Sequence, residues 1–429
     1  MNVEAWKRSV ICFHCVLMNR SITSDTNHQR FGFIDGLRGV AALAVMIHHI
    51  IWFTPWDFFG SDLATEWVYR IGYWGKCGVP VFFVISGFVI AHSLRKAAVT
   101  PKFVGTFFLR RSMRLDPPYW CTIAVMIAIS YACMAWTSIE PPTALPKFGQ
   151  LVAHAFYLQN LLGYENVSVG FWTLCIEIQF YMMFVVMLGL AQFLSQRSER
   201  FCQVDIASPN SASTSSLIAV FAPVMLASLF TFTYLEQLDN WFLRYYCLFC
   251  LGACLSASRC GMIPKWIAWI AIGLFAIRVG IEYQRSVFSG LVVGGLILFA
   301  DARGGLSTWL MSRMWQYLGK ISYSLYLIHY PVVHLIMHFG KQLSGDNVPM
   351  IYVWMTVSLF ASIAVGAVLY RVVEAPSIAL ASSFSKRVPR SASPEFAQPE
   401  VTQQEFAPGS FASAPQPAAM VTVAVEKFN

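Results

Sequence analysis

Ten stretches of mainly apolar residues, each close to the length of a membrane-spanning helix, constrain this chain more than any other feature. A spanning helix needs ~20 such residues, and lipid accommodates apolar surface that a soluble core cannot bury. Of the 429 residues, 57% are apolar and 12% charged, against roughly 25% charged in soluble domains. The stretches are 34–53, 74–92, 119–138, 171–194, 217–234, 241–257, 265–281, 287–300, 321–339 and 349–372. The sequence therefore predicts an all-α, polytopic transmembrane bundle of about ten helices.

Basic residues indicate how this bundle is oriented. When alternate loops are assigned to opposite sides, 21 of the 30 lysines and arginines fall on one side and six on the other, and three lie within or at the ends of helices. Cytoplasmic loops carry an excess of Lys and Arg, so both termini are predicted to be cytoplasmic. The net charge of +8 follows this loop pattern, and we do not expect nucleic-acid binding.

The ends of the chain differ in composition from its middle. We expect a weakly structured cytoplasmic segment over 1–30, a transmembrane domain over 31–378, and a disordered cytoplasmic tail over 379–429, which is rich in Ser, Pro, Ala and Gln. We expect no cleaved signal peptide and no soluble catalytic domain, so any chemistry belongs to the membrane part. Cys12 and Cys15 form a lone CxxC, which is weak support for a metal, and no metal site is expected.

Two ionisable residues in the first segment are functional candidates, because such groups are costly inside a membrane. Arg38 and His49 are eleven residues apart, which is ~1100° of helical rotation, so they share a face and lie ~16 Å apart along the axis. His49 is predicted to lie deep toward the outer side, and Arg38 at the cytoplasmic mouth. The structural alternative is an arginine that reaches for the interface and a histidine that hydrogen-bonds within the bundle.

Glu177 is the acidic candidate of the fourth segment. Thr173, Glu177 and Tyr181 follow at intervals of four residues and project together. Glu177 is predicted to lie ~9 Å in from the outer face, a depth similar to that of His49. A carboxylate there can orient an imidazole and stabilise its charged form, as a general base requires. The alternative is a buried glutamate that joins two helices through some other donor.

Other polar and small residues suit either binding or packing. Arg111 and Arg114 lie in the predicted cytoplasmic loop between the second and third segments. They form a cluster suited to phosphate, although positive-inside bias also produces such clusters. The polar face of segment 321–339, which includes His329, could equally serve interhelical hydrogen bonding. The glycines and proline of the run 78–87 fit close helix packing.

Taken in order, these features resemble the acyltransferase-3 family of integral membrane acyltransferases, which modify surface polysaccharides, lipopolysaccharide and related glycans. The resemblance covers about 31 to 378. It rests on the opening run from Asp35 to Arg38, Arg38-x10-His49, the run from Pro80 to Gly87, Arg111-x-x-Arg114 before Pro-Tyr-Trp, the run from Phe171 to Leu174 with Glu177, the run from Gly319 to His329, and the closing Glu374-Ala-Pro.

The resemblance implies an O-acyltransferase whose donor is acetyl-CoA held from the cytoplasm, with His49 as the essential histidine. The catalytic residues are then His49, Glu177 and Arg38, and the residues that bind the donor are Arg111, Arg114 and Ser86. Two departures from the family pattern concern this site. Asp116-Pro117-Pro118 stands where a less acidic stretch is usual, and His48 is a second candidate base beside His49.

We therefore hypothesise that the donor's phosphates dock at Arg111 and Arg114 and that its pantetheine arm threads inward between helices. His49, oriented by Glu177, then deprotonates an acceptor hydroxyl or carries the acyl group itself. The resemblance places the acceptor among cell-surface polysaccharides and glycolipids. It places the protein in the cytoplasmic (inner) membrane of a bacterium, with the lipid bilayer and polysaccharide-biosynthesis machinery as partners.

The alternative function is a secondary transporter of a small sugar, lipid or weak acid, with His49 and Glu177 as a proton relay. A transporter of this kind predicts inverted repeats, and the two halves of the chain show no convincing similarity. It also has no need of a phosphate-docking arginine cluster. The sequence does not specify the acceptor or the length of the acyl chain.

Overall fold

The computed structural model describes residues 31–54, 63–136, 139–202, 212–345 and 347–387, and the regular structure within these ranges is helical, without strands. The predicted segment 1–30 lies outside the described residues, as does the predicted tail from 388 onward. The elements are α2 (Gly32–Trp52), α3 (Leu63–Trp74), η2 (Gly75–Cys77), α4 (Gly78–Leu94), α5 (Pro101–Trp136), α6 (Phe148–Ala155), α7 (Phe171–Cys202), α8 (Thr214–Phe230), η3 (Phe232–Tyr234), η4 (Glu236–Leu238), α9 (Phe242–Arg259), α10 (Lys265–Ile281), α11 (Arg285–Ala302), α12 (Arg313–Ser344), α13 (Val348–Leu369), η5 (Tyr370–Glu374) and α14 (Ala375–Arg387).

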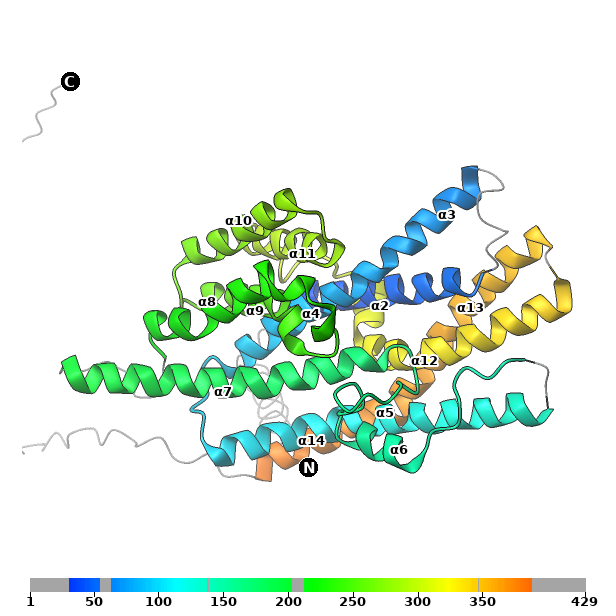
Figure 1. Cartoon of the computed structure of the whole chain (residues 1–429), viewed down its shortest axis with the longest axis horizontal. Coiled ribbons are helices and arrows are strands. Elements are labelled where there is room, and N and C mark those ends of the chain that lie inside the picture. The colour runs from blue at the N-terminus through cyan, green and yellow to red at the C-terminus, as the bar shows by residue number, and fades with distance from the viewer. Residues whose placement is uncertain (1–30, 55–62, 137–138, 203–211, 346, 388–429) are drawn as a thin grey trace, which may run out of the picture. The chain divides into compact units, whose positions relative to one another are not determined.

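Each of the ten predicted apolar segments coincides with helical structure (Figure 1). Seven helical stretches are long and apolar enough to cross a membrane, at 32–52, 63–94, 101–135, 171–198, 214–234, 285–302 and 348–383. The other three predicted segments form α9, α10 and α12. α10, for instance, has 17 residues, fewer than the ~20 that usually span. The chain is an integral membrane protein of all-helical fold, and the count of about ten spans and the cytoplasmic termini remain predictions.

The expected loop between the second and third segments is instead part of a helix. α5 begins at Pro101 and continues through both arginines and through Pro117 and Pro118 to Trp136. Proline removes a backbone donor from a helix, but neighbouring helices and hydroxyl side chains can bond the carbonyls that this leaves free. The carbonyls left free by Pro117 and Pro118 are those of Met113 and Arg114; next to them, the Tyr323 hydroxyl of α12 donates to the Leu115 carbonyl at 2.9 Å and ties this part of α5 to α12. Arg111 and Arg114 are therefore held on a helix.

Glycines bring α2 and α12 into backbone contact. A side chain at Gly319 would meet the backbone of Asp35, and one at Gly39 would meet the backbone around Gly319. Small residues at such points let membrane helices approach closely. His49 follows Gly39 by ten residues, and His329 follows Gly319 by ten. Because the two histidine side chains also meet, α2 and α12 run in the same direction.

A second close contact joins α4 and α9. A side chain at Gly87 would meet the carbonyl of Phe249, and one at Gly252 would meet the carbonyl of Val84. The largest cluster of buried apolar side chains surrounds this contact, with members from α2, α4 and α7–α11. Two smaller clusters connect α5, α6, α7 and α12, and α2, α12 and α13. The helices that carry the candidate site are thus fixed along most of their length.

Candidate active site

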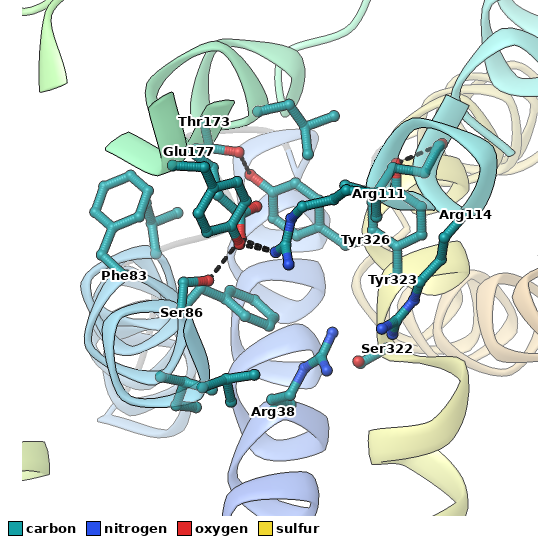
Figure 2. Close-up of a pocket in the computed structure, with 17 residues that line it drawn as sticks. Arg38, Phe83, Ser86, Arg111, Arg114, Thr173, Glu177, Ser322, Tyr323 and Tyr326 are labelled. Atoms are coloured by element: carbon teal, nitrogen blue, oxygen red, sulfur yellow. Dashed lines mark hydrogen bonds and ion pairs between the residues drawn. The ribbon is translucent and has the colours of Figure 1, made fainter. Parts of the chain in front are cut away.

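A cavity of about 100 Å³ lies between α2, α4, α5, α7 and α12. Figure 2 shows three arginines around this space, with the carboxylate of Glu177 and the hydroxyl of Ser86 on one side. Five of the six residues predicted for the site therefore lie together, and they are Arg38, Ser86, Arg111, Arg114 and Glu177. His49 does not line this cavity.

Glu177 is the acceptor of a compact hydrogen-bond network. Its Oε1 accepts from the Ser86 hydroxyl at 2.6 Å and from the Tyr181 hydroxyl, and it forms an ion pair with Arg111 at 3.5 Å. The Arg111 guanidinium also donates to the Tyr181 hydroxyl and lies over that ring, 3.5 Å from its centroid. The prediction that Glu177 orients His49 is wrong, because no hydrogen bond or ion pair joins the two in the described part of the chain. Similar depth could not reveal which helices are neighbours.

Arg38 and Arg114 carry the charge that this network leaves uncompensated. Within the described ranges neither guanidinium makes a hydrogen bond or ion pair, and the Nε of Arg114 is buried without a partner. Both side chains reach into the same space in Figure 2. Three arginines and one glutamate line the cavity, and the buried Glu374 carboxylate, outside the lining, attracts Arg38 and Arg114. An excess of positive charge remains, which suits an anionic or strongly polarised ligand group.

His49 belongs to a histidine pair beyond this cavity. Its Nδ1 lies 3.0 Å from the Nε2 of His329 and 3.0 Å from the carbonyl of Val45, while the Nδ1 of His329 lies 3.1 Å from the carbonyl of Leu325. Carbonyl oxygens only accept, so in a neutral pair both Nδ1 atoms carry protons. The Nε2 of His329 then accepts from His49. This leaves the Nε2 of His49 with a free lone pair, as a base or nucleophile requires.

An aromatic layer separates the histidine pair from the arginine cavity. Tyr326 lines the cavity, exchanges a hydrogen bond of 2.8 Å with the Thr173 hydroxyl, and has its ring centroid 5.9 Å from that of His329. The ring of Phe82, also in the cavity lining, packs 5.5 Å from Tyr326. The two rings therefore lie between the cavity and the histidine pair.

Comparison with known proteins identifies the family. A sequence model of the acyltransferase domain family matches residues 31–371. The chain belongs to this acyltransferase family. It is 28% identical to acyltransferase MdmB of Streptomyces mycarofaciens over 85% of this chain and 95% of that protein. It is 24% identical to nodulation protein 10 of Rhizobium leguminosarum bv. viciae over 82% of this chain and 95% of that protein. It is also 23% identical to YrhL of Bacillus subtilis strain 168, named as a candidate peptidoglycan O-acetyltransferase, over 72% of this chain and 50% of that protein. No solved structure matches.

The two departures noted in the sequence have structural explanations in this acyltransferase. His48 points away from His49's partner, and its Nδ1 bonds the Gly72 carbonyl of α3 at 3.1 Å, so it joins two helices. Asp116 accepts hydrogen bonds from Ser112 and, at 2.8 Å, from the Tyr157 hydroxyl. It therefore holds α5 to the segment after α6 and does not line the cavity.

Two buried polar contacts of the acyltransferase were not predicted from the sequence, that of Glu374 with Ser324 and that of His329 with His49. The Glu374 carboxylate is buried and accepts from the Ser324 backbone at 3.2 Å and hydroxyl at 2.5 Å. The available signal was the closing Glu374-Ala-Pro, two residues after the last apolar segment. His329 was noticed as part of a polar face, but its partner depended on the packing of α2 against α12.

Proposed function

We propose that this acyltransferase transfers an acetyl group from acetyl-CoA to a hydroxyl of a cell-surface polysaccharide or glycolipid, in the cytoplasmic membrane of a bacterium. The observation that carries the proposal is the His49–His329 pair, which leaves a free imidazole nitrogen one aromatic layer from a cavity with unpaired arginines. The name of one relative, a candidate peptidoglycan O-acetyltransferase, supports both the acetyl group and a glycan acceptor.

In the proposed reaction, the Nε2 of His49 takes the proton of the acceptor hydroxyl as its oxygen attacks the thioester carbonyl. The new C–O bond forms, the C–S bond breaks, and the proton passes from His49 to the departing coenzyme A thiolate. His329 shares the positive charge while His49 is protonated, because its Nε2 accepts the Nδ1 proton. Arg38, Arg111, Arg114 and Ser86 hold polar groups of the donor in the cavity, and Glu177 fixes the position of Arg111.

Nothing in the described part of the structure favours the transporter alternative. A proton relay through His49 and Glu177 would need the two groups in one hydrogen-bonded path, whereas each bonds different partners within the described residues. Membership of an acyltransferase family supports group transfer instead.

The test is acetyl transfer by the purified protein in nanodiscs, with labelled acetyl-CoA and released coenzyme A as the readout. We expect saturable binding and turnover by the wild type, and loss of donor binding in Arg111→Ala/Arg114→Ala. Arg110→Ala is the matched control, since this arginine is adjacent on α5 but does not line the cavity. Wild-type protein that neither binds nor turns over acetyl-CoA would refute the donor assignment.

Replacing His329 should impair the reaction through His49. His329→Phe removes the acceptor of the Nδ1 proton, and we expect kcat to fall by about 10²-fold with little change in the KM for acetyl-CoA, as for other orienting groups of a general base. The pH dependence of kcat should also shift. His329→Gln, whose amide oxygen can accept the same proton, should recover part of the loss. Equal loss in both variants would argue for a packing role alone.

A further inference from the structure

A groove with a volume of about 320 Å³ lies between α8, α9 and α10, which are neighbours in Figure 1. We call it the apolar groove, because Arg95 is the one charged residue among its described lining residues. The side chains that α9 contributes are all small, and they are Cys250, Ala253, Cys254 and Ala257. The apolar side chains at the rim, on α8 and α10, are exposed, and they are Ile218, Leu226, Trp266 and Ile270. The groove therefore opens toward the surroundings of the bundle, which are lipid for an integral membrane protein.

A larger cavity, of about 630 Å³, adjoins the apolar groove at the ends of α4, α9, α10 and α11. We call it the basic pocket, after the basic residues in its lining, Arg95, Lys96, Arg259 and Lys265. Arg95 and Met262 line both spaces, and Lys265 of the pocket directly precedes Trp266 of the groove. The positive-inside rule accounts for basic residues in these loops, but it does not place them at the end of an apolar groove. The two spaces form one amphipathic site.

Most of the positive charge of the basic pocket is free to meet a ligand. Asp301 is the one carboxylate among the described lining residues, and it pairs with Arg259. Arg95 donates to the His92 carbonyl at 2.7 Å, and within the described ranges it pairs with no acidic side chain. Lys96 and Lys265 likewise form no hydrogen bond or ion pair with any residue that the structure describes. Three cations are therefore available, and they suit a phosphate group.

The site has the depth and orientation of a lipid in one leaflet. Trp266 and Trp269, at the start of α10, are 59% and 62% exposed. Tryptophan is enriched where the membrane meets water, so the basic pocket lies at the level of the headgroups. From Lys265 the groove follows α10 to Leu274, which is ~14 Å along the helix axis. The loops that form the pocket are predicted to be cytoplasmic, and the cytoplasmic leaflet carries anionic lipids.

We propose that this site binds an anionic glycerophospholipid of the bilayer, with its phosphate in the basic pocket and an acyl chain in the apolar groove. Charge and shape together select this ligand. A soluble phosphate compound leaves the apolar groove unfilled, and a zwitterionic lipid brings its own cation toward Lys96 and Lys265. The site shares no lining residue with the cavity around Glu177. The bound lipid bridges α4, α8, α9 and α10 and stabilises the folded protein.

The test is native mass spectrometry of the full chain in detergent, with phosphatidylglycerol and phosphatidylcholine added separately. We expect the wild type to bind phosphatidylglycerol at least about 10-fold more tightly than phosphatidylcholine. Arg95→Ala/Lys265→Ala should weaken phosphatidylglycerol binding at least about 10-fold, because each basic residue beside an anionic headgroup contributes several-fold to the affinity. Lys102→Ala/Arg197→Ala is the matched control, since it removes one lysine and one arginine that are exposed and line neither space.

The acyl chain is tested by filling the apolar groove. Ala257→Leu adds a branched side chain to its lining, and Ala276→Leu adds the same group to an exposed position of α10 outside it. Phosphatidylglycerol should raise the thermal unfolding midpoint of the wild type and of Ala276→Leu. It should raise the midpoint of Ala257→Leu much less, because the chain no longer fits.

Equal affinity of the wild type for the two lipids would overturn the proposal, and so would wild-type binding of phosphatidylglycerol by Arg95→Ala/Lys265→Ala. The chain-free probe is sn-glycerol 3-phosphate. If it stabilises the wild type as much as phosphatidylglycerol does, and Ala257→Leu responds to phosphatidylglycerol like Ala276→Leu, the ligand is a soluble phosphate compound and the lipid assignment is wrong.

Discussion

Substituting His49 with alanine is expected to abolish acetyl transfer while the protein remains folded. The imidazole supplies the only proton acceptor that the proposed reaction uses, and general bases typically contribute 10²–10⁴-fold to rate. Its removal leaves the buried Nε2 of His329 without its donor, which costs about 1–3 kcal/mol of stability. We would measure turnover of labelled acetyl-CoA alongside the thermal unfolding midpoint. Saturable binding of labelled acetyl-CoA should be unchanged.

The neighbouring His48 provides a matched control. It is buried and bonds the Gly72 carbonyl of α3, so His48→Ala should lower stability by about 1–3 kcal/mol through an unsatisfied acceptor and keep most of the turnover. The two substitutions should therefore cost similar stability, and only His49→Ala should lower the rate of acetyl transfer. If His48→Ala lost activity as completely as His49→Ala, or if His49→Ala stayed fully active, the assignment of the base would be wrong.

Local patterns in the sequence predicted much of this architecture. Each of the ten apolar segments predicted from length coincides with a helix, because the cost of placing polar groups in lipid acts on each helix separately. The same cost pointed to Arg38 and Glu177, whereas Arg111 and Arg114 were chosen as a cationic cluster and Ser86 from the family resemblance; all five line the cavity. The expectation of a loop at Arg111 was wrong, since Pro117 and Pro118 interrupt a soluble helix but are tolerated within α5.

Pairings between helices could not be read in the same way. Glu177 and His49 were matched by depth, yet depth along the membrane normal leaves lateral neighbours undefined. The contact of Gly39 with Gly319 decides that α12, and with it His329, lies beside α2. That contact depends on two residues 280 positions apart in one chain. A periodic pattern within either helix carries no information about it.

The contact between α4 and α9 should be the most sensitive point of the fold. Gly252→Leu places a branched side chain against the backbone carbonyl of Val84, which cannot rotate away as a side chain would. Overpacking usually costs about 1–3 kcal/mol and occasionally more. Here the two helices must separate, so we expect a cost at or above that range, out of a total stability of roughly 5–15 kcal/mol. Size-exclusion chromatography in detergent should show aggregated or absent protein.

Gly273→Leu on α10 is the control for this substitution, because a side chain there meets nothing within 4 Å. The two variants add the same apolar group to a helix, so hydrophobicity and helix propensity change equally. Gly273→Leu should elute as a single peak with a wild-type unfolding midpoint. The unfolding midpoint of Gly252→Ala should lie between those of Gly273→Leu and Gly252→Leu. A monodisperse Gly252→Leu protein with wild-type stability would show that α4 and α9 are not in backbone contact. Because α4 carries Ser86, the position of this side chain in the cavity would then be wrong as well.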